Sequence, residues 1–329
     1  MSPLRIVVSE SADFSPAAVE LLRASGVVTL GDLDRPGLLA AVCDADVLWV
    51  RLRHRIDREV MAVAPHLRFI VTATTGLNHI DTEEAERRGI RVISLRGETE
   101  FLDEIVATAE HTLALALALL RHVPAAAAHV VDGGWNRDRF KGAEIRGKTV
   151  GVVGYGRLGR IVARYFSALG ARIVAADPAI DTAKLPPFVE AVAFDELLSR
   201  ADIVTLHVAL DVHTAGFFGR QQFRAMKRGA WFVNTSRGEL IDEGGLLDAL
   251  SSGHLAGAAL DVIADEHAER LGARPVVDYA RHHDHLIITP HVGGCTAESM
   301  EKTEVFLATR LRDALLNDGV SEGHFACAE

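Results

Sequence analysis

The sequence is poor in cysteine and in aromatic residues. Among 329 residues there are 3 cysteines, and Phe, Trp and Tyr together make up 6%. Cys43, Cys295 and Cys327 are odd in number and far apart, which argues against a disulfide framework and favours reduced thiols. The sequence therefore excludes the class of small secreted proteins that disulfides hold together.

Long apolar runs and long basic runs are also missing. The most apolar stretch, Ala107 to Leu120, is interrupted by Glu110 and His111 and is too short to span a bilayer. Residues 1–8 lack the charged lead and apolar core of a signal peptide. The net charge is −10, so a phosphate backbone is an unexpected partner. We therefore expect a cytoplasmic protein with no membrane and no nucleic acid partner.

Short apolar runs alternate with amphipathic helical patterns, and 329 residues are enough for two domains with separate cores. Strands are expected at residues 4–8, 27–30, 47–50, 67–72 and 91–94, and then at 149–153, 171–176, 202–206, 230–234, 256–260 and 286–289. This alternation predicts the α/β class, with helices on both faces of parallel sheets and a second sheet of six strands.

Two long helices are expected outside the strands. Residues 103–121 are rich in Ala and Leu on nearly every side, so we expect this helix to be buried between domains or against a second subunit. Residues 297–316 form the other helix, which is long enough to return to the first domain. The first domain is therefore expected to be discontinuous in sequence.

A glycine-rich turn lies between a strand and a helix of the second part. Gly154, Gly156 and Gly159 have the G-x-G-x-x-G spacing, in which the glycines permit the turn, admit a pyrophosphate and pack helix on strand. The next strand ends in Asp177, whose carboxylate could accept hydrogen bonds from ribose hydroxyls and would repel a ribose phosphate. The spacing alone also occurs in turns without a ligand, but this order of elements predicts binding of NAD rather than NADP.

Three residues with chemically useful side chains, Arg237, Glu266 and His291, follow expected strands of the second part. Groups beyond the carboxyl ends of parallel strands converge on the ligand crevice. An arginine can hold a carboxylate and polarise a carbonyl, and a histidine can donate a proton near neutral pH. A neighbouring carboxylate would orient the imidazole and favour its charged form. Together these residues predict reduction of a 2-oxo acid.

Each residue taken singly has a simpler interpretation, because an arginine is most often on the surface and a histidine beside proline is most often a hydrogen-bonded loop residue. The chain has 15 histidines, so most of them must have no catalytic role. His282, His283 and His285, with Asp284 among them, suggest a metal site, but their crowding in a polar segment fits a solvated turn better. We expect no metal.

Several motifs in the same order resemble the NAD-dependent D-2-hydroxyacid dehydrogenases, which include phosphoglycerate, glycerate, formate and D-lactate dehydrogenases. The motifs are Gly154-Tyr-Gly-Arg-Leu-Gly159, Asn234-Thr-Ser-Arg-Gly238, Ala259-Leu-Asp-Val262 with Glu266, and Thr289-Pro-His-Val-Gly-Gly294. The resemblance covers nearly the whole chain. It implies two Rossmann-like doubly wound domains, with an NAD-binding domain (99–292) inserted in a discontinuous flavodoxin-like substrate domain (1–98 and 293–329).

The resemblance also implies a role for each matching residue. Arg237 would anchor the substrate, His291 would donate or accept the proton, and Glu266 would be the partner of that histidine. The residues implied in cofactor binding are Gly154, Gly156, Arg157, Leu158, Gly159, Asp177, His207, Thr214, Thr235, Ser236, Asp261, Gly294 and Thr108. The residues assigned to substrate binding are Arg51, Thr75, Gly76, Leu77, Arg96 and Arg237, with backbone N–H groups around Thr75, Gly76 and Leu77 cradling the substrate carboxylate.

The chain departs from the family pattern at two positions. His267 stands where a proline usually follows the catalytic glutamate, and Ala209 replaces a proline that is frequent after the strand at 202–206. Neither change removes a catalytic group, so we expect an active enzyme. Family members are usually homodimers joined through the long helix and an arm, here about 103–145, which implies a homodimer.

The substrate is less well defined by the sequence. Arg51 falls where family members acting on phosphorylated acids carry an anion-binding arginine, and with Arg96 it could form a second anion site. A solvated basic turn around Arg53 and Arg55 is the alternative. We predict a 2-oxo acid with a second anionic group, such as a phosphate, phosphonate or carboxylate.

Two other functions remain as alternatives. The first is a glyoxylate or hydroxypyruvate reductase acting on small 2-oxo acids with neutral side chains, in which Arg51 and Arg96 would matter little. The second belongs to another class, an NAD(H)-sensing binding protein of the corepressor type. The intact set of arginine, glutamate and histidine argues against pure sensing.

Overall fold

The computed structural model describes residues 3–266 and 271–317. His267, Cys327 and the part of the predicted substrate domain beyond residue 317 lie outside these residues. The described chain divides into two units, one built from the chain up to Glu104 together with the chain from Cys295 on, and the other from Ile105–Gly294. The exact limits predicted for the two domains, 1–98 with 293–329 and 99–292, stay predictions.

The first unit is built on a parallel sheet of five strands in the order β2-β1-β3-β4-β5, which is flavodoxin-like. The strands are β1 (Leu4–Val8), β2 (Gly26–Leu30), β3 (Val47–Val50), β4 (Phe69–Thr72) and β5 (Arg91–Ser94). Val50 pairs with Thr72, so β3 and β4 end at the same edge of the sheet. The segments that follow these strands, from Arg51 and from residue 73, therefore start side by side.

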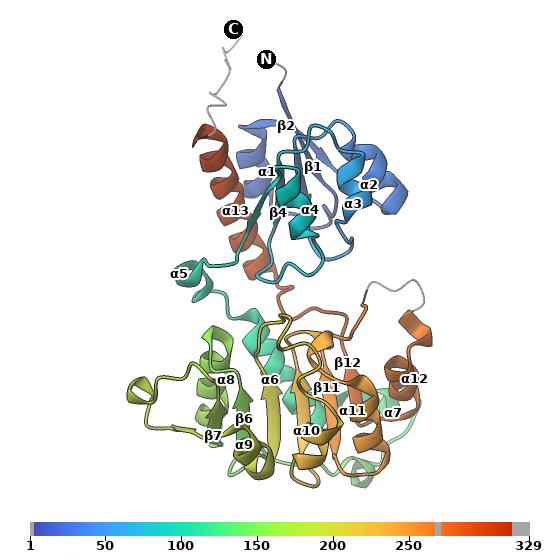
Figure 1. Cartoon of the computed structure of the whole chain (residues 1–329). Helices are drawn as coiled ribbons and strands as arrows, with labels where there is room; N and C mark the ends of the chain where they lie inside the picture. The colour runs from blue at the N-terminus through green and yellow to red at the C-terminus, as the bar shows by residue number, and fades with distance from the viewer. Residues whose placement is uncertain (1–2, 267–270, 318–329) are drawn as a thin grey trace. The chain divides into compact units, whose positions relative to one another are not determined.

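Helices cover both faces of this sheet (Figure 1). The covering helices are α1 (Pro16–Arg23), α2 (Arg35–Val42), α3 (Arg58–Ala62), α4 (Thr82–Arg87) and α13 (Ala297–Asn317), and the single turn α5 (Thr99–Leu102) stands apart from the sheet. The long helix α13 packs against α1, β4 and β5, so the last described segment completes the first unit. Side chains with capping oxygens start several helices; Asp34 accepts the Gly37 N–H, and Asp81 accepts the Glu84 N–H.

The second unit contains a parallel sheet of seven strands in the order β12-β11-β10-β9-β6-β7-β8. The strands are β6 (Thr149–Val153), β7 (Arg172–Ala176), β8 (Val189–Ala191), β9 (Ile203–Leu206), β10 (Trp231–Asn234), β11 (Gly257–Leu260) and β12 (Leu286–Ile288). The order reverses between β6 and β9. In doubly wound folds the crevice at such a reversal holds the ligand.

Helices also cover both faces of the second sheet (Figure 1). The covering helices are α6 (Ala107–Leu120), α8 (Arg157–Ala168), α9 (Phe194–Arg200), α10 (Arg220–Ala225), α11 (Glu243–Ser251) and α12 (Pro275–His282), with short 3₁₀ turns at Arg137–Phe140, Thr182–Lys184, Gly238–Leu240 and Leu271–Ala273. The helix α7 (Val123–Val131) contacts α6 and has no buried residue. Apolar side chains of α6 and α8 form one core with the sheet, and those of α9 to α12 form the other. The prediction of doubly wound α/β units is confirmed.

Two details differ from the prediction. The second sheet has seven strands, not six, because the three-residue strand Val189–Ala191 pairs in parallel with β7 at the edge. The helix expected over 103–121 is α6, which begins only at Ala107 after a separate turn of helix, Thr99–Leu102. Among the described residues no single helix is long and apolar enough to cross a bilayer; Thr99–Leu120 and Val123–Val131 meet that criterion only as a pair bent by 61°.

Candidate active site

The glycine-rich turn follows β6 at the reversal point of the second sheet. Gly154 has a φ of +86°, a conformation that residues with side chains rarely adopt. A Cβ on Gly159 would lie 2.1 Å from the Gly154 oxygen, so glycine is needed for the helix to approach the turn. At Gly156 a Cβ would meet nothing within 4 Å, and no side chain caps α8. The space and the uncapped helix start fit a bound pyrophosphate.

The carboxylate of Asp177, at the end of β7, is hydrogen-bonded to the backbone of this turn. Its Oδ2 accepts the Tyr155 N–H at 2.7 Å, and its Oδ1 accepts the Ala179 N–H at 2.8 Å. The acid predicted to hold the ribose thus lies directly beside the turn. Arg157 donates to the Ile105 oxygen at 2.7 Å, and Leu158 packs against the core between α6, α8 and the sheet.

Other predicted cofactor residues lie at the ends of β9 and β10. His207 follows β9, and burial lowers the pKa of this histidine to about 3, so the imidazole is neutral. The Thr235 hydroxyl lies 2.8 Å from that of Thr112 on α6, and the Ser236 hydroxyl donates to the Leu206 oxygen at 2.8 Å. The Thr214 hydroxyl bonds within its own loop, the loop that follows β9, where it donates to the Ala209 oxygen at 2.8 Å.

Arg237 lies after β10 and is held there by a close backbone contact. A Cβ on the next residue, Gly238, would lie 1.9 Å from the Ile263 carbonyl carbon, so only glycine allows the two segments to touch. Burial lowers the pKa of Arg237, while Glu266 and Glu239 act in the opposite direction. Arg237 is therefore a partly desolvated cation with a carboxylate, Glu266, in its field.

His291 and Glu266 form a direct pair. The Nδ1 atom of His291 lies 2.8 Å from Oε1 and 2.9 Å from Oε2 of Glu266, and both side chains are 20% exposed. The backbone of His291 has a φ of +52°, so the residue is held in a left-handed conformation. With Nδ1 engaged by the carboxylate, Nε2 is the ring nitrogen left to exchange a proton with a substrate.

Asp261 fixes the segment that carries His291. Its carboxylate accepts the N–H groups of Val292 at 2.9 Å and of Gly293 at 2.8 Å, and its carbonyl oxygen accepts the His291 N–H at 2.8 Å. Burial raises the pKa of Asp261, but the hydrogen bonds from His111, Thr289 and the two N–H groups outweigh burial and hold the pKa below its usual value. Asp261 is an ionised clamp on the histidine loop.

The residues missed by the sequence prediction are the partners of this clamp. The Nε2 atom of His111 lies 3.1 Å from Asp261 Oδ1, and the Thr289 hydroxyl donates to the same oxygen at 2.6 Å. Thr289 begins one of the motifs on which the resemblance rests, and His111 lies in Ala109-Glu-His-Thr112, which the resemblance also covers, so position within a motif was the available signal. Two further predicted cofactor residues lie close to this segment. A Cβ on Gly293 would lie 3.3 Å from the methyl group of Thr108, and Gly294 is the next residue along the chain.

The predicted substrate residues Thr75, Gly76 and Leu77 belong to the first unit, in the loop after β4. The Thr74 hydroxyl donates to the Gly76 oxygen at 2.8 Å and braces this loop. Within the described part of the chain, no hydrogen bond uses the N–H groups of these three residues. Successive free N–H groups of this kind make an anion-binding concavity.

The two predicted anion-binding arginines have different surroundings. Arg51 follows β3 and pairs with Glu304 of α13, with Nη2 2.6 Å from Oε1. Arg96 follows β5 and is exposed; its backbone N–H lies 3.3 Å from the Ser94 hydroxyl. Arg51 is thus already ion-paired within the protein and is not a free cation.

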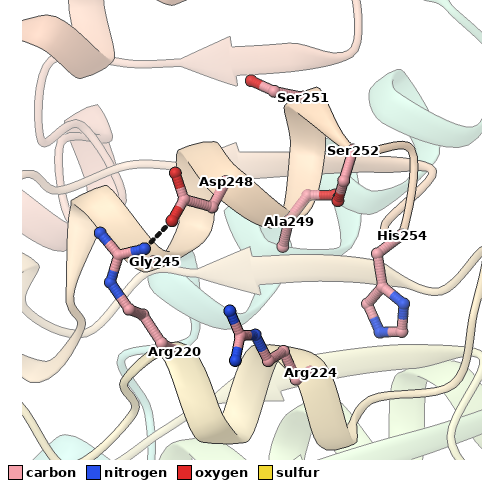
Figure 2. Close-up of a pocket in the computed structure, with 8 residues that line it drawn as sticks. All are labelled: Arg220, Arg224, Gly245, Asp248, Ala249, Ser251, Ser252 and His254. Carbon is pink, nitrogen blue, oxygen red and sulfur yellow. Dashed lines mark hydrogen bonds and ion pairs between the residues drawn. The ribbon is translucent and has the colours of Figure 1, made fainter.

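A groove of about 560 Å³ lies in the second unit between α10 and α11 (Figure 2). Arg220, Arg224, Asp248 and His254 are among its lining residues, and Arg220 is ion-paired with Asp248. None of the predicted site residues lines the groove. In the described part of the chain no group of three His, Cys, Asp or Glu side chains could hold a metal, and His283 and His285 instead contact Tyr279.

Comparison with known proteins identifies the family. Residues 113–293 match the family described as D-isomer specific 2-hydroxyacid dehydrogenase, NAD binding domain. The D-3-phosphoglycerate dehydrogenase of Mycobacterium tuberculosis is 38% identical over 311 residues, which are 92% of this chain and 57% of that protein. The chain thus spans little more than half the length of the curated relatives it matches.

Two solved structures share the whole architecture. The TT0316 protein from Thermus thermophilus is 35% identical, with a TM-score of 0.81 over 95% of this chain and 97% of that chain. D-Lactate dehydrogenase from Aquifex aeolicus, complexed with NAD and lactic acid, is 25% identical, with a TM-score of 0.81 over 99% of both chains. The chain therefore belongs to the NAD-dependent D-isomer specific 2-hydroxyacid dehydrogenase family, and its second unit carries the NAD-binding domain.

Proposed function

We propose that this chain interconverts a 2-oxo acid and a D-2-hydroxy acid in an NAD-dependent reaction. The observation that carries the proposal is the pairing of His291 with Glu266 at 2.8 Å in the same unit as the glycine-rich turn. NAD(H), when bound, supplies or takes up the hydride. The residues Gly154, Gly156, Gly159 and Asp177 would hold it.

The chain's own residues would do the rest of the chemistry. His291 gives a proton from Nε2 to the carbonyl oxygen during reduction and takes it back during oxidation. Glu266 keeps the ring oriented and stabilises its charged form. Arg237 binds the substrate and polarises its carbonyl, and its partial burial strengthens that interaction because the local dielectric is low.

We further propose that the substrate carboxylate binds the N–H groups of Thr75, Gly76 and Leu77. Support comes from the free N–H groups in this loop, since a carboxylate can accept several of them at once. Binding through backbone atoms would make this part of recognition common to all 2-oxo acids. Selection among acids would then depend on the residues that face the rest of the substrate.

Two kinds of substrate side chain are considered, one with a second anionic group and one that is small and uncharged. A second anionic group is supported by the names of the relatives, which are D-3-phosphoglycerate dehydrogenases, and by the exposed Arg96. A small uncharged side chain is favoured by the ion pair between Arg51 and Glu304, because a paired arginine attracts a further anion weakly. The first candidate would need both Arg51 and Arg96; the second would need neither.

The first experiment is oxidation of NADH by the purified protein with a panel of 2-oxo acids. Turnover should be abolished or greatly reduced in Arg237→Ala and unaffected in Arg164→Ala, which changes an exposed arginine of α8. Tight NADH binding without reduction of any acid would contradict the enzyme proposal and leave the NAD(H)-sensing alternative. Product should be assigned as the D-isomer by chiral chromatography.

We also propose a cytoplasmic homodimer joined through α6, α7 and the arm, about 103–145. The support is apolar exposure on this part of the chain: α7 has no buried residue, Val131 is 86% exposed and Trp135 is 90% exposed. Sedimentation velocity tests this proposal: the wild type should be a dimer, and the double variant Val131→Glu with Trp135→Glu should be a monomer. A monomeric wild type at micromolar concentration would contradict it.

A further inference from the structure

Arg51 is held in the first unit by three kinds of contact. Its Nη2 donates to Glu304 Oε1 at 2.6 Å, and its Nη1 donates to the Ala12 carbonyl oxygen at 2.8 Å. The guanidinium carbon also lies 5.7 Å from the centre of the Phe14 ring. Both terminal nitrogens therefore have partners from the protein itself, and the side chain is only 20% exposed.

Glu304 is built into this arrangement. The residue is 1% exposed, on the face of α13 that packs against α1. Its second oxygen, Oε2, accepts the backbone N–H of Ser15 at 2.7 Å, at the start of α1. The carboxylate is therefore fixed at both oxygens, and it occupies a terminal nitrogen of Arg51 that would otherwise be open to an anion.

A second buried carboxylate lies at the same end of the sheet. Glu10, which is 7% exposed, accepts the N–H of Arg51 at 2.9 Å and the N–H of Arg53 at 3.0 Å. The loop after β3 thus gives two of its backbone donors to an internal acid. Glu10 therefore adds a second buried carboxylate beside the backbone of Arg51, and its negative charge opposes the approach of a further anion.

We infer that Glu304 is a specificity-determining residue, which occupies Arg51 in place of a substrate anion and so restricts the enzyme to 2-oxo acids with an uncharged side chain. The inference rests on the proposed function. An arginine binds a phosphate or carboxylate strongly when its charge and both terminal nitrogens are available. Here Glu304 balances the charge, and Glu304 and the Ala12 carbonyl oxygen together occupy the two terminal nitrogens. A second anion would have to displace a buried carboxylate or lie close to one.

The test compares kcat/KM for hydroxypyruvate and for 3-phosphohydroxypyruvate, with NADH, in the wild type and in Glu304→Gln. The wild type should prefer hydroxypyruvate. Glu304→Gln leaves the Arg51 charge unbalanced, so the ratio of phosphorylated to neutral substrate should rise at least about tenfold. The double variant Arg51→Gln with Glu304→Gln should lose this rise. Glu301→Gln, which changes an exposed residue of the same helix, should keep the wild-type ratio.

Each result decides the inference. A wild type that prefers the phosphorylated acid overturns it, and so does an unchanged ratio in a folded Glu304→Gln; in both cases the proposed function stands. A wild type that reduces no 2-oxo acid removes the proposed function and this inference with it. If circular dichroism shows that Glu304→Gln is unfolded, Glu304→Asp, which keeps the charge but withdraws it from Arg51, is used and should raise the ratio in the same direction.

Discussion

Nδ1 of His291 lies 2.8 Å from Oε1 of Glu266, although the two residues come from different loops of the second unit. A carboxylate in this place leaves one orientation of the ring and directs Nε2 away from the acid. The pair has the form of an acid–base catalyst and its orienting partner. We expect the proton-transfer step to depend on both.

Replacement of the histidine tests its catalytic role. Because the residue has a φ of +52°, His291→Asn is the suitable change, since asparagine tolerates the left-handed conformation. We expect kcat for 2-oxo acid reduction to fall by about 10²–10⁴-fold, while NADH binding measured by fluorescence changes little. The exposed His66→Asn is the control. Unchanged kcat in His291→Asn would assign the proton transfer to another group.

The glycines of the turn should respond differently to the same substitution. Gly156→Ala meets no atom within 4 Å, so the melting temperature should stay close to that of the wild type, while the added methyl group should weaken NADH binding. Gly159→Ala brings a Cβ to 2.1 Å from the Gly154 oxygen and should lower the free energy of unfolding by about 1–3 kcal/mol. Equal loss of stability in both variants would show that the space at Gly156 is not available to a ligand.

Asp261 should make stability depend on pH. Its pKa is lower in the folded protein than its ordinary value of 3.8, so its contribution is complete above that value and is lost as the pH falls through the lower folded pKa. Asp261→Asn should lower the free energy of unfolding at pH 7 by about 1–3 kcal/mol and reduce its decline at acidic pH. Urea unfolding at several pH values measures both effects. The exposed Asp13→Asn should behave as the wild type, and an identical acid profile in Asp261→Asn would contradict the prediction.

The choice between NADH and NADPH should depend on Asp177. Asp177→Asn removes the charge that would repel a ribose phosphate but keeps an acceptor for the Tyr155 N–H. We expect the ratio of kcat/KM with NADPH to that with NADH to rise at least about tenfold. Asp181→Asn, four residues further on and half exposed, is the matched control. A constant ratio would mean that the phosphate is excluded by something other than this carboxylate.

Much of the second unit could be predicted from the sequence because its signals are local. The turn at Gly154, the acid at Asp177 and the polar residues after successive strands all lie within a few residues of an apolar run that marks a strand. The missed edge strand, Val189–Ala191, lacks such a signal, because it has three residues and a glutamate at its centre. The delayed start of α6 is similar, since residues 103–106 look helical in composition, but Asp103 and Glu104 form a turn and Ile105 and Val106 are not helical.

The contacts that could not be predicted join residues far apart in the chain. His111 reaches Asp261 across 150 positions, and no periodicity or propensity encodes that distance. The sequence suggests Arg51 as an anion receptor because its position and its type are visible there. Its partner, Glu304, looks from the sequence like one of several acids on an amphipathic helix, and only the packing of α13 against α1 brings the two together.

The position of α13 at the end of the described chain also affects the order in which the two units can finish folding during synthesis. Arg51 and Glu304 are 253 residues apart, so at about 5–20 residues per second the ribosome needs roughly 13–50 s to supply the acid after the arginine. The second unit is complete before α13 exists. The strands synthesised first would therefore be the last to acquire their full set of neighbours, and the nascent first unit would remain open to chaperones throughout that interval.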